Sequence, residues 1–141
     1  FIMKKFILLL TALSMFSANV PAKTLDTTDT ESSISEISPR YTYIIETYND
    51  LILSSNKANC YAYTKTPPKY RAKVKVELQQ KGTSWTTLKT WIVTDSSKAI
   101  VDENYTLTKG CSYRLKTTHY ALNTNGSVAE YITQYSSTAT Y

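Results

Sequence analysis

The chain has 141 residues, with 16 Lys and Arg, 11 Asp and Glu, and one His, which gives a formal charge of +5. This length suits a single domain, and a hydrophobic content of 42% is too high for a wholly disordered chain. Three glycines, one histidine and two cysteines exclude a glycine-rich phosphate loop and a four-ligand zinc site, so we expect no cofactor and no metal.

Residues 1–22 have the order of a secretory signal peptide. Lys4 and Lys5 precede an apolar run over 6–16. Residues 20–22, Val-Pro-Ala, then fit the small-x-small pattern that a signal peptidase recognises. The run is about eleven residues, whereas roughly twenty are needed to span a bilayer, so an uncleaved membrane anchor is the less favoured alternative. We expect cleavage after Ala22, a secreted protein and no membrane span.

Residues 23–40 are predicted to form a flexible acidic linker. They hold two basic residues against four acidic ones, and only three large apolar residues. Such a segment cannot bury enough surface to offset the entropy lost on ordering. The folded domain is therefore expected over 41–141.

From residue 41 onward, β-branched and aromatic residues dominate and turn residues recur, which predicts an all-β domain. The alternation is clearest over 71–80, where small and branched apolar residues share one face and charged residues the other. Asn125-Gly126 is a strong hairpin signal before the last strand. About seven strands favour an immunoglobulin-like two-sheet sandwich over a closed barrel. The expected strands are 44–53, 58–66, 71–80, 84–93, 98–107, 111–120 and 127–135.

The two cysteines, Cys60 and Cys111, both occupy the inward phase of their predicted strands. An exported chain with an even number of cysteines permits a disulfide, and an immunoglobulin-like order would place these two on opposite sheets. Closing this loop would stabilise the fold by roughly 4 kcal/mol. We therefore predict a Cys60–Cys111 disulfide, with two buried free thiols as the alternative.

Several segments resemble small secreted proteins of Gram-positive bacteria that have an immunoglobulin-like sandwich and no assigned function. They are SPRY at 38–41, KVKVELQQK at 73–81, CSYRLK at 111–116 and the pair Trp85 and Trp91. The resemblance covers most of 38–141. It implies export and the sandwich fold, and it brings no catalytic residues.

The sequence offers little for catalysis. His119 is the single histidine that could serve a hydrolytic triad, and its place toward the end of a predicted strand is more typical of a partly buried structural residue. The acids of the domain are scattered over strands and turns, as solvated surface charges are. We therefore predict no catalytic residues and no enzyme activity, with a cell-wall hydrolase as a less favoured possibility.

A cationic row is predicted on the outer face of the sandwich. In an immunoglobulin-like order the third and sixth strands are neighbours, so their outward residues lie side by side. Five of these residues are cations, and Glu77 is the one acid among them. This row would attract an extracellular polyanion such as an anionic cell-wall polymer. The alternative is a surface that only confers solubility. No nucleic-acid module is recognisable, so we expect no nucleic-acid partner. The candidate residues are Arg71, Lys73, Lys75, Arg114 and Lys116.

Aromatic residues form a second candidate surface. Trp85 and Trp91 are six positions apart, so they share a face if their strand has no bulge, and Tyr61 and Tyr63 lie on the outward phase of theirs. Flat rings stack on sugars, which suggests glycan binding. The alternative is that the tryptophans fill the core.

Taken together, these features predict a secreted, non-catalytic β-sandwich module that binds an extracellular polyanion or glycan at the cell surface. The alternative is a secreted module that contacts another protein, including a second copy of itself through its edge strands.

Overall fold

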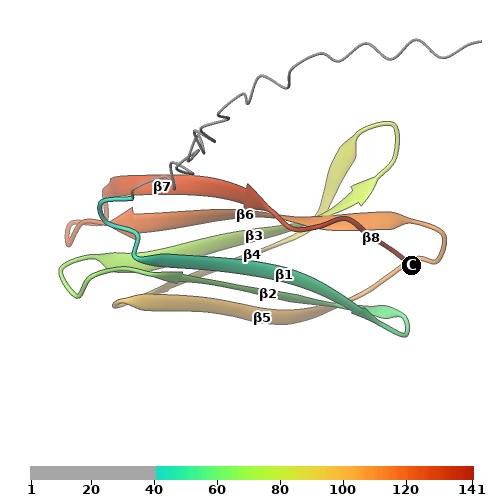
Figure 1. Cartoon of the computed structure of the whole chain (residues 1–141), viewed down its shortest axis with the longest axis horizontal. Coiled ribbons are helices and arrows are strands. Elements are labelled where there is room, and N and C mark those ends of the chain that lie inside the picture. Colours follow the sequence, from blue (N-terminus) through green and yellow to red (C-terminus); the bar gives the residue numbers. More distant parts are fainter. Residues whose placement is uncertain (1–40) are drawn as a thin grey trace, which may run out of the picture. The chain divides into compact units, whose positions relative to one another are not determined.

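The computed structural model describes residues 41–141, and the predicted signal peptide over 1–22 and linker over 23–40 lie outside this range. The described residues form eight β-strands and no helix (Figure 1), which confirms the all-β prediction. No helix within this range could therefore cross a membrane. The strands are β1 (Glu46–Ser54), β2 (Lys57–Lys65), β3 (Arg71–Lys81), β4 (Trp85–Asp95), β5 (Lys98–Thr106), β6 (Ser112–Leu122), β7 (Val128–Tyr135) and β8 (Ala139–Thr140).

The strands form two antiparallel sheets. One sheet has the order β1-β2-β5, and the other has the order β4-β3-β6-β7 with β8 paired to β6. Figure 1 shows β1, β2 and β5 in one layer and β3, β6 and β7 in the other. The seven longer strands lie within two residues of their predicted bounds, whereas the two-residue β8 was not predicted.

The hydrophobic core lies between the two sheets. The segments in which apolar and polar residues alternate are strands because every second side chain enters this core. On β2, Ala58, Cys60 and Ala62 have no exposed surface, and the residues between them are partly exposed. Four inward residues of β3 and two of β6 belong to the same buried cluster. Because side chains alternate between faces, this burial fixes which residues face solvent. The β3 and β6 members are Ala72, Val74, Val76, Leu78, Tyr113 and Leu115.

The carboxylate of Glu130 on β7 binds the chain just before β1. Its oxygens accept backbone N–H bonds from Thr42, Tyr43 and Ile44 at 2.9, 2.7 and 2.8 Å. Burial raises the pKa of Glu130, but the three N–H donors outweigh this and the net pKa lies below the ordinary value. This contact joins the start of the three-stranded sheet to the other sheet.

The predicted Cys60–Cys111 disulfide is wrong, because both cysteines are free thiols. Cys60 lies within β2 and faces the core, with Leu51 and Glu103 as its register partners. Cys111 lies one residue before β6, where its Sγ accepts a hydrogen bond from Nε2 of Gln80 at 3.1 Å. The first inward position of β6 is filled by Tyr113 instead. An inward phase on two predicted strands was therefore not sufficient for a disulfide.

Replacing Glu130 with Gln should lower the free energy of unfolding by about 2 kcal/mol, because a charged acceptor of three N–H bonds is lost. Urea denaturation at neutral pH measures this loss. Glu103→Gln is the matched control, since Glu103 is an exposed acid on β5. Equal stability of the two variants would contradict the role given to Glu130.

Iodoacetamide should modify both cysteines when the protein is unfolded without reductant, and mass spectrometry would count the additions. In the folded protein Cys60 should resist modification, because burial raises the pKa of its thiol to about 12. An unfolded, unreduced protein that takes up no iodoacetamide would instead show that the disulfide exists.

Candidate functional site

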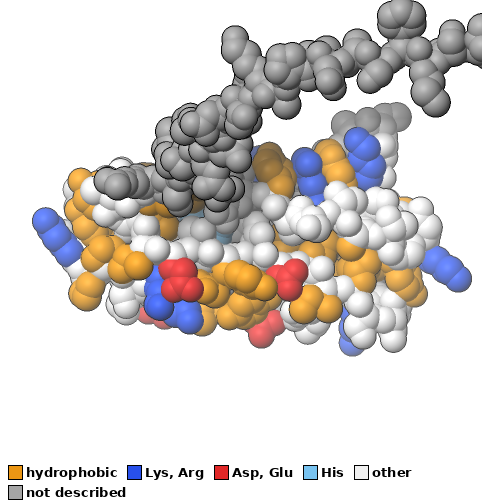
Figure 2. Space-filling view, viewed as in Figure 1, with side chains coloured by type: hydrophobic (Ala, Val, Ile, Leu, Met, Phe, Trp, Pro, Cys, Tyr) orange, Lys and Arg blue, Asp and Glu red, His pale blue; other side chains and the backbone are white. Residues whose placement is uncertain are grey.

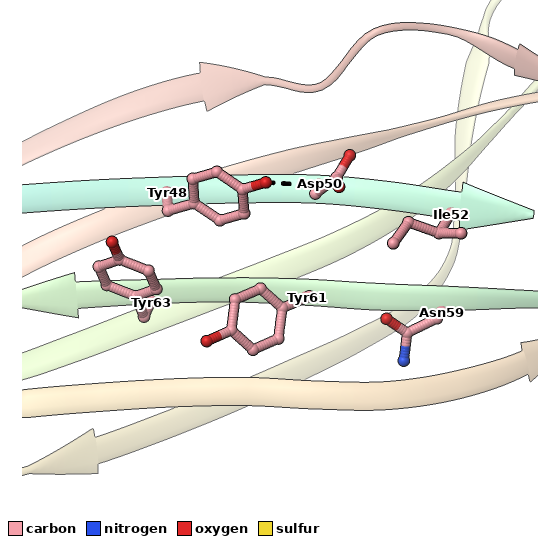
Figure 3. Close-up of a pocket in the computed structure, with 6 residues that line it drawn as sticks. All are labelled: Tyr48, Asp50, Ile52, Asn59, Tyr61 and Tyr63. Atoms are coloured by element: carbon pink, nitrogen blue, oxygen red, sulfur yellow. Dashed lines mark hydrogen bonds between the residues drawn. The ribbon is translucent and has the colours of Figure 1, made fainter.

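The outer surface of the three-stranded sheet carries a cluster of aromatic and polar side chains from β1 and β2. The antiparallel register places Tyr48 opposite Tyr63, Asp50 opposite Tyr61, and Ile52 opposite Asn59. We call these six residues the tyrosine face. They line a shallow pocket of about 440 Å³, shown in Figure 3. In Figure 2, hydrophobic side chains gather over these strands with acidic side chains on either side.

The three tyrosine rings are packed against one another. The rings of Tyr48 and Tyr63 are stacked, with centroids 5.7 Å apart and planes 17° apart. Tyr61 meets Tyr48 and Tyr63 edge-on, with centroid distances of 5.9 and 6.2 Å. These are favourable aromatic geometries, so the rings hold one another in position while remaining partly exposed.

Carboxylates flank Tyr61 on both neighbouring strands, since Asp50 on β1 and Asp102 on β5 are its register partners. The Tyr48 hydroxyl donates to Oδ2 of Asp50 at 3.4 Å, and Nδ2 of Asn59 donates to Oδ1 of Asp102 at 2.8 Å. The pocket therefore combines flat apolar rings with carboxylate, amide and hydroxyl groups at its edge.

A charged group anchors one end of the tyrosine face. The Tyr63 hydroxyl donates a hydrogen bond to Glu46, and Lys65 Nζ lies 3.0 Å from the other oxygen of this carboxylate. Lys98 Nζ lies 4.7 Å from the centre of the Tyr63 ring. The Tyr63 hydrogen bond and Lys65 lower the pKa of Glu46, and the same hydrogen bond raises the pKa of Tyr63. These contacts orient the Tyr63 ring.

Sequence reasoning identified Tyr61 and Tyr63 but missed Tyr48, Asp50, Ile52 and Asn59 as their companions. The missing information was the pairing of β1 with β2. The alternation of β1 is also hard to read, because its inward residues include the polar Thr47 and Asn49 while the apolar Ile52 is 53% exposed. Knowledge of the antiparallel register of β1 with β2 would have placed these four residues beside Tyr61 and Tyr63.

The five candidate polyanion-binding residues lie on β3 and β6, which are hydrogen-bonded neighbours in the second sheet. Two of the five, Lys75 and Lys116, form ion pairs. Glu77 Oε2 lies 3.3 Å from Lys75 Nζ and 3.9 Å from Lys116 Nζ. Lys73 Nζ lies 5.0 Å from the centre of the Tyr120 ring. The remaining two are Arg71, at the exposed start of β3, and Arg114.

Trp85 and Trp91 do not share a face, because β4 contains a bulge. Leu78 pairs with Lys89 whereas Gln79 pairs with Thr87, so Leu88 is an extra residue on β4. Trp91 lies opposite Val76 and packs against the core, while Trp85 lies opposite Lys81. The four aromatic glycan candidates are therefore not one platform: Tyr61 and Tyr63 lie on one sheet, and the tryptophans on the other.

His119 lies inside the sandwich with no exposed surface, deeper than predicted. Its Nδ1 is 2.8 Å from the Thr64 hydroxyl on β2, which links the two sheets. Burial lowers the pKa of His119 from 6.5 to about 4, so the ring is neutral at neutral pH. Its Nε2 is buried and has no hydrogen-bond partner among residues 41–141.

Among residues 41–141, no group of three or more His, Cys, Asp or Glu side chains is arranged to hold a metal ion. Comparison of the chain with protein-family models, with curated proteins and with solved structures found no match.

Acid should destabilise the protein through His119. Between pH 6.5 and about 4 the unfolded chain binds a proton that the folded protein excludes, so stability falls as the pH falls, by up to about 3 kcal/mol. Urea denaturation at several pH values measures this slope. His119→Gln should flatten it whatever its effect on stability at neutral pH. An unchanged slope would show that other groups cause the acid sensitivity.

Proposed function

We propose that the protein is a secreted, non-catalytic glycan-binding module with an immunoglobulin-like β-sandwich, and that the tyrosine face is its binding site. The observation that carries this proposal is the packing of three partly exposed tyrosine rings beside the carboxylate of Asp50 and the amide of Asn59 in one shallow pocket.

Two features support the immunoglobulin-like assignment. The sheet orders β1-β2-β5 and β4-β3-β6-β7 group the first, second and fifth strands against the third, fourth, sixth and seventh. Near the start of β6, the Tyr113 hydroxyl accepts a hydrogen bond from Thr108 N and donates one to Thr108 O, both at 2.9 Å. A tyrosine at this corner that bonds back to the preceding backbone is typical of such sandwiches.

The chemistry of the tyrosine face suits a sugar. A pyranose ring has a flat face of C–H groups, which packs on an aromatic ring, and a rim of hydroxyls, which donate to carboxylates. Tyr61 offers the ring, and Asp50 and Asp102 stand on either side of it. Since both flanking groups are anionic, the face should favour a neutral glycan over an acidic one.

Export is supported by the charged, apolar and small-residue order of residues 1–22. The resemblance of segments 38–41, 73–81 and 111–116 to small secreted Gram-positive proteins agrees with this location. At a cell surface, a glycan would be an abundant partner.

Tyr61→Ala should weaken binding to a neutral oligosaccharide about tenfold or more, because it removes the central stacking ring. A glycan array identifies the ligand, and isothermal titration calorimetry of both proteins measures the change. Tyr131→Ala is the control, since Tyr131 is 66% exposed and lies on β7 of the other sheet. If no neutral glycan binds, or if Tyr131→Ala weakens binding as much as Tyr61→Ala, the proposal fails.

A further inference from the structure

Arg114 on β6 is held in an unusual way on the outer surface of the five-stranded sheet. Its guanidinium carbon lies 4.1 Å from the centre of the Trp85 ring and 4.3 Å from the centre of the Tyr135 ring. Its Nε donates to Oε1 of Gln79 at 2.9 Å. An arginine on β6 is thus in contact with residues from β3, β4 and β7.

These contacts fix the orientation of the guanidinium without neutralising it. Stacking on aromatic rings and a bond to a neutral amide leave the positive charge in place, and within residues 41–141 no carboxylate forms an ion pair with Arg114. The one hydrogen bond found for this side chain uses Nε. Its two terminal nitrogens, which form the fork that recognises oxyanions, have no partner among the described residues.

The surrounding surface is strongly basic. Six cationic residues occupy the outward positions of β3 and β6 on this side of the sheet, against one acid, Glu77. Lys81, one of the six, also contacts Trp85, with Nζ 5.3 Å from the ring centre. This concentration of charge would draw an anion toward Arg114. The six are Arg71, Lys73, Lys75, Lys81, Arg114 and Lys116.

We propose that Arg114 is a second binding site that takes an oxyanion of an acidic polysaccharide, either a carboxylate or a sulfate. The preorganised fork binds two oxygens at once, and Gln79, Trp85 and Tyr135 act as positioning residues. Because the fork is held before the ligand arrives, little side-chain entropy is lost on binding. The other cations attract the polymer but do not select the group that is bound.

This inference does not depend on the proposed neutral-glycan site. The two sites lie on different sheets, Arg114 on the five-stranded sheet and the tyrosine face on the three-stranded one. A protein with both could hold a neutral part and an acidic part of cell-surface glycans at the same time. The test of one proposed site can therefore give a negative result without contradicting the proposal for the other site.

The test compares the full chain with two variants of matched charge. Arg114→Lys keeps the charge but removes the fork, and Lys116→Arg is the reverse exchange at a neighbouring outward position. The probes are polygalacturonate for carboxylate, dextran sulfate for sulfate and unmodified dextran as the uncharged polymer. Biolayer interferometry at low and high salt measures each affinity.

We expect the native protein and Lys116→Arg to bind at least one acidic polymer, more weakly at high salt, with no binding to dextran through this site. Arg114→Lys should weaken that binding about tenfold, a loss that a purely electrostatic surface would not show. Whichever acidic probe shows the loss identifies the oxyanion. Equal affinity of Arg114→Lys and the native protein, or binding to neither acidic polymer, would overturn the proposal.

A second measurement covers the case in which Arg114→Lys disturbs the fold. In the unmodified protein, the NMR signal of the Arg114 Nε–H group should shift when the acidic polymer is added, and the signal of Arg71 should shift less. A shift confined to Arg71, or no shift at either arginine, would also overturn the proposal. Tyr61→Ala should leave the Arg114 response unchanged.

Discussion

The structure depends on the burial of small side chains from β2 between the two sheets. Ala58, Cys60 and Ala62 have no exposed surface, and their small size lets β2 approach the branched residues of β3 closely. Since alternate residues of a strand face opposite sides, this burial forces Tyr61 and Tyr63 outward. A shift of one residue in β2 would bury the tyrosines and expose the core. The candidate binding surface is therefore a direct consequence of core packing.

The same constraint gives the second sheet a different outer surface. On β3, buried Val74, Val76 and Leu78 alternate with charged residues, so the cations of β3 and β6 gather on one side. The outer surface of the three-stranded sheet instead holds tyrosines with carboxylates beside them. The two sheets thus present chemically different surfaces, one suited to a neutral ring with hydroxyls and one suited to an oxyanion. We propose that this difference would let the protein bind a chemically mixed partner such as a cell-surface glycan.

Much of the fold could be predicted because alternation is a local property. The alternating pattern alone predicts the strands over 71–80 and 58–66 and the outward phase of Tyr61 and Tyr63. The errors came from properties that are not local. The extra residue Leu88 reverses the phase between Trp91 and Trp85. Cys111 lies just outside the strand that was predicted to contain it, because β6 begins at Ser112. Tyr48 and Asp50 join the site through the register of β1 with β2, which the sequence does not specify.

The most direct test of this account is an NMR titration of the protein with the neutral oligosaccharide that binds best on an array, with the tyrosine ring signals assigned. If the account is right, the rings of Tyr48, Tyr61 and Tyr63 will shift together at one ligand affinity, while Tyr131 on β7 will not. Shifts confined to aromatic residues of the five-stranded sheet would contradict it. An absence of any shift at saturating sugar would contradict it as well.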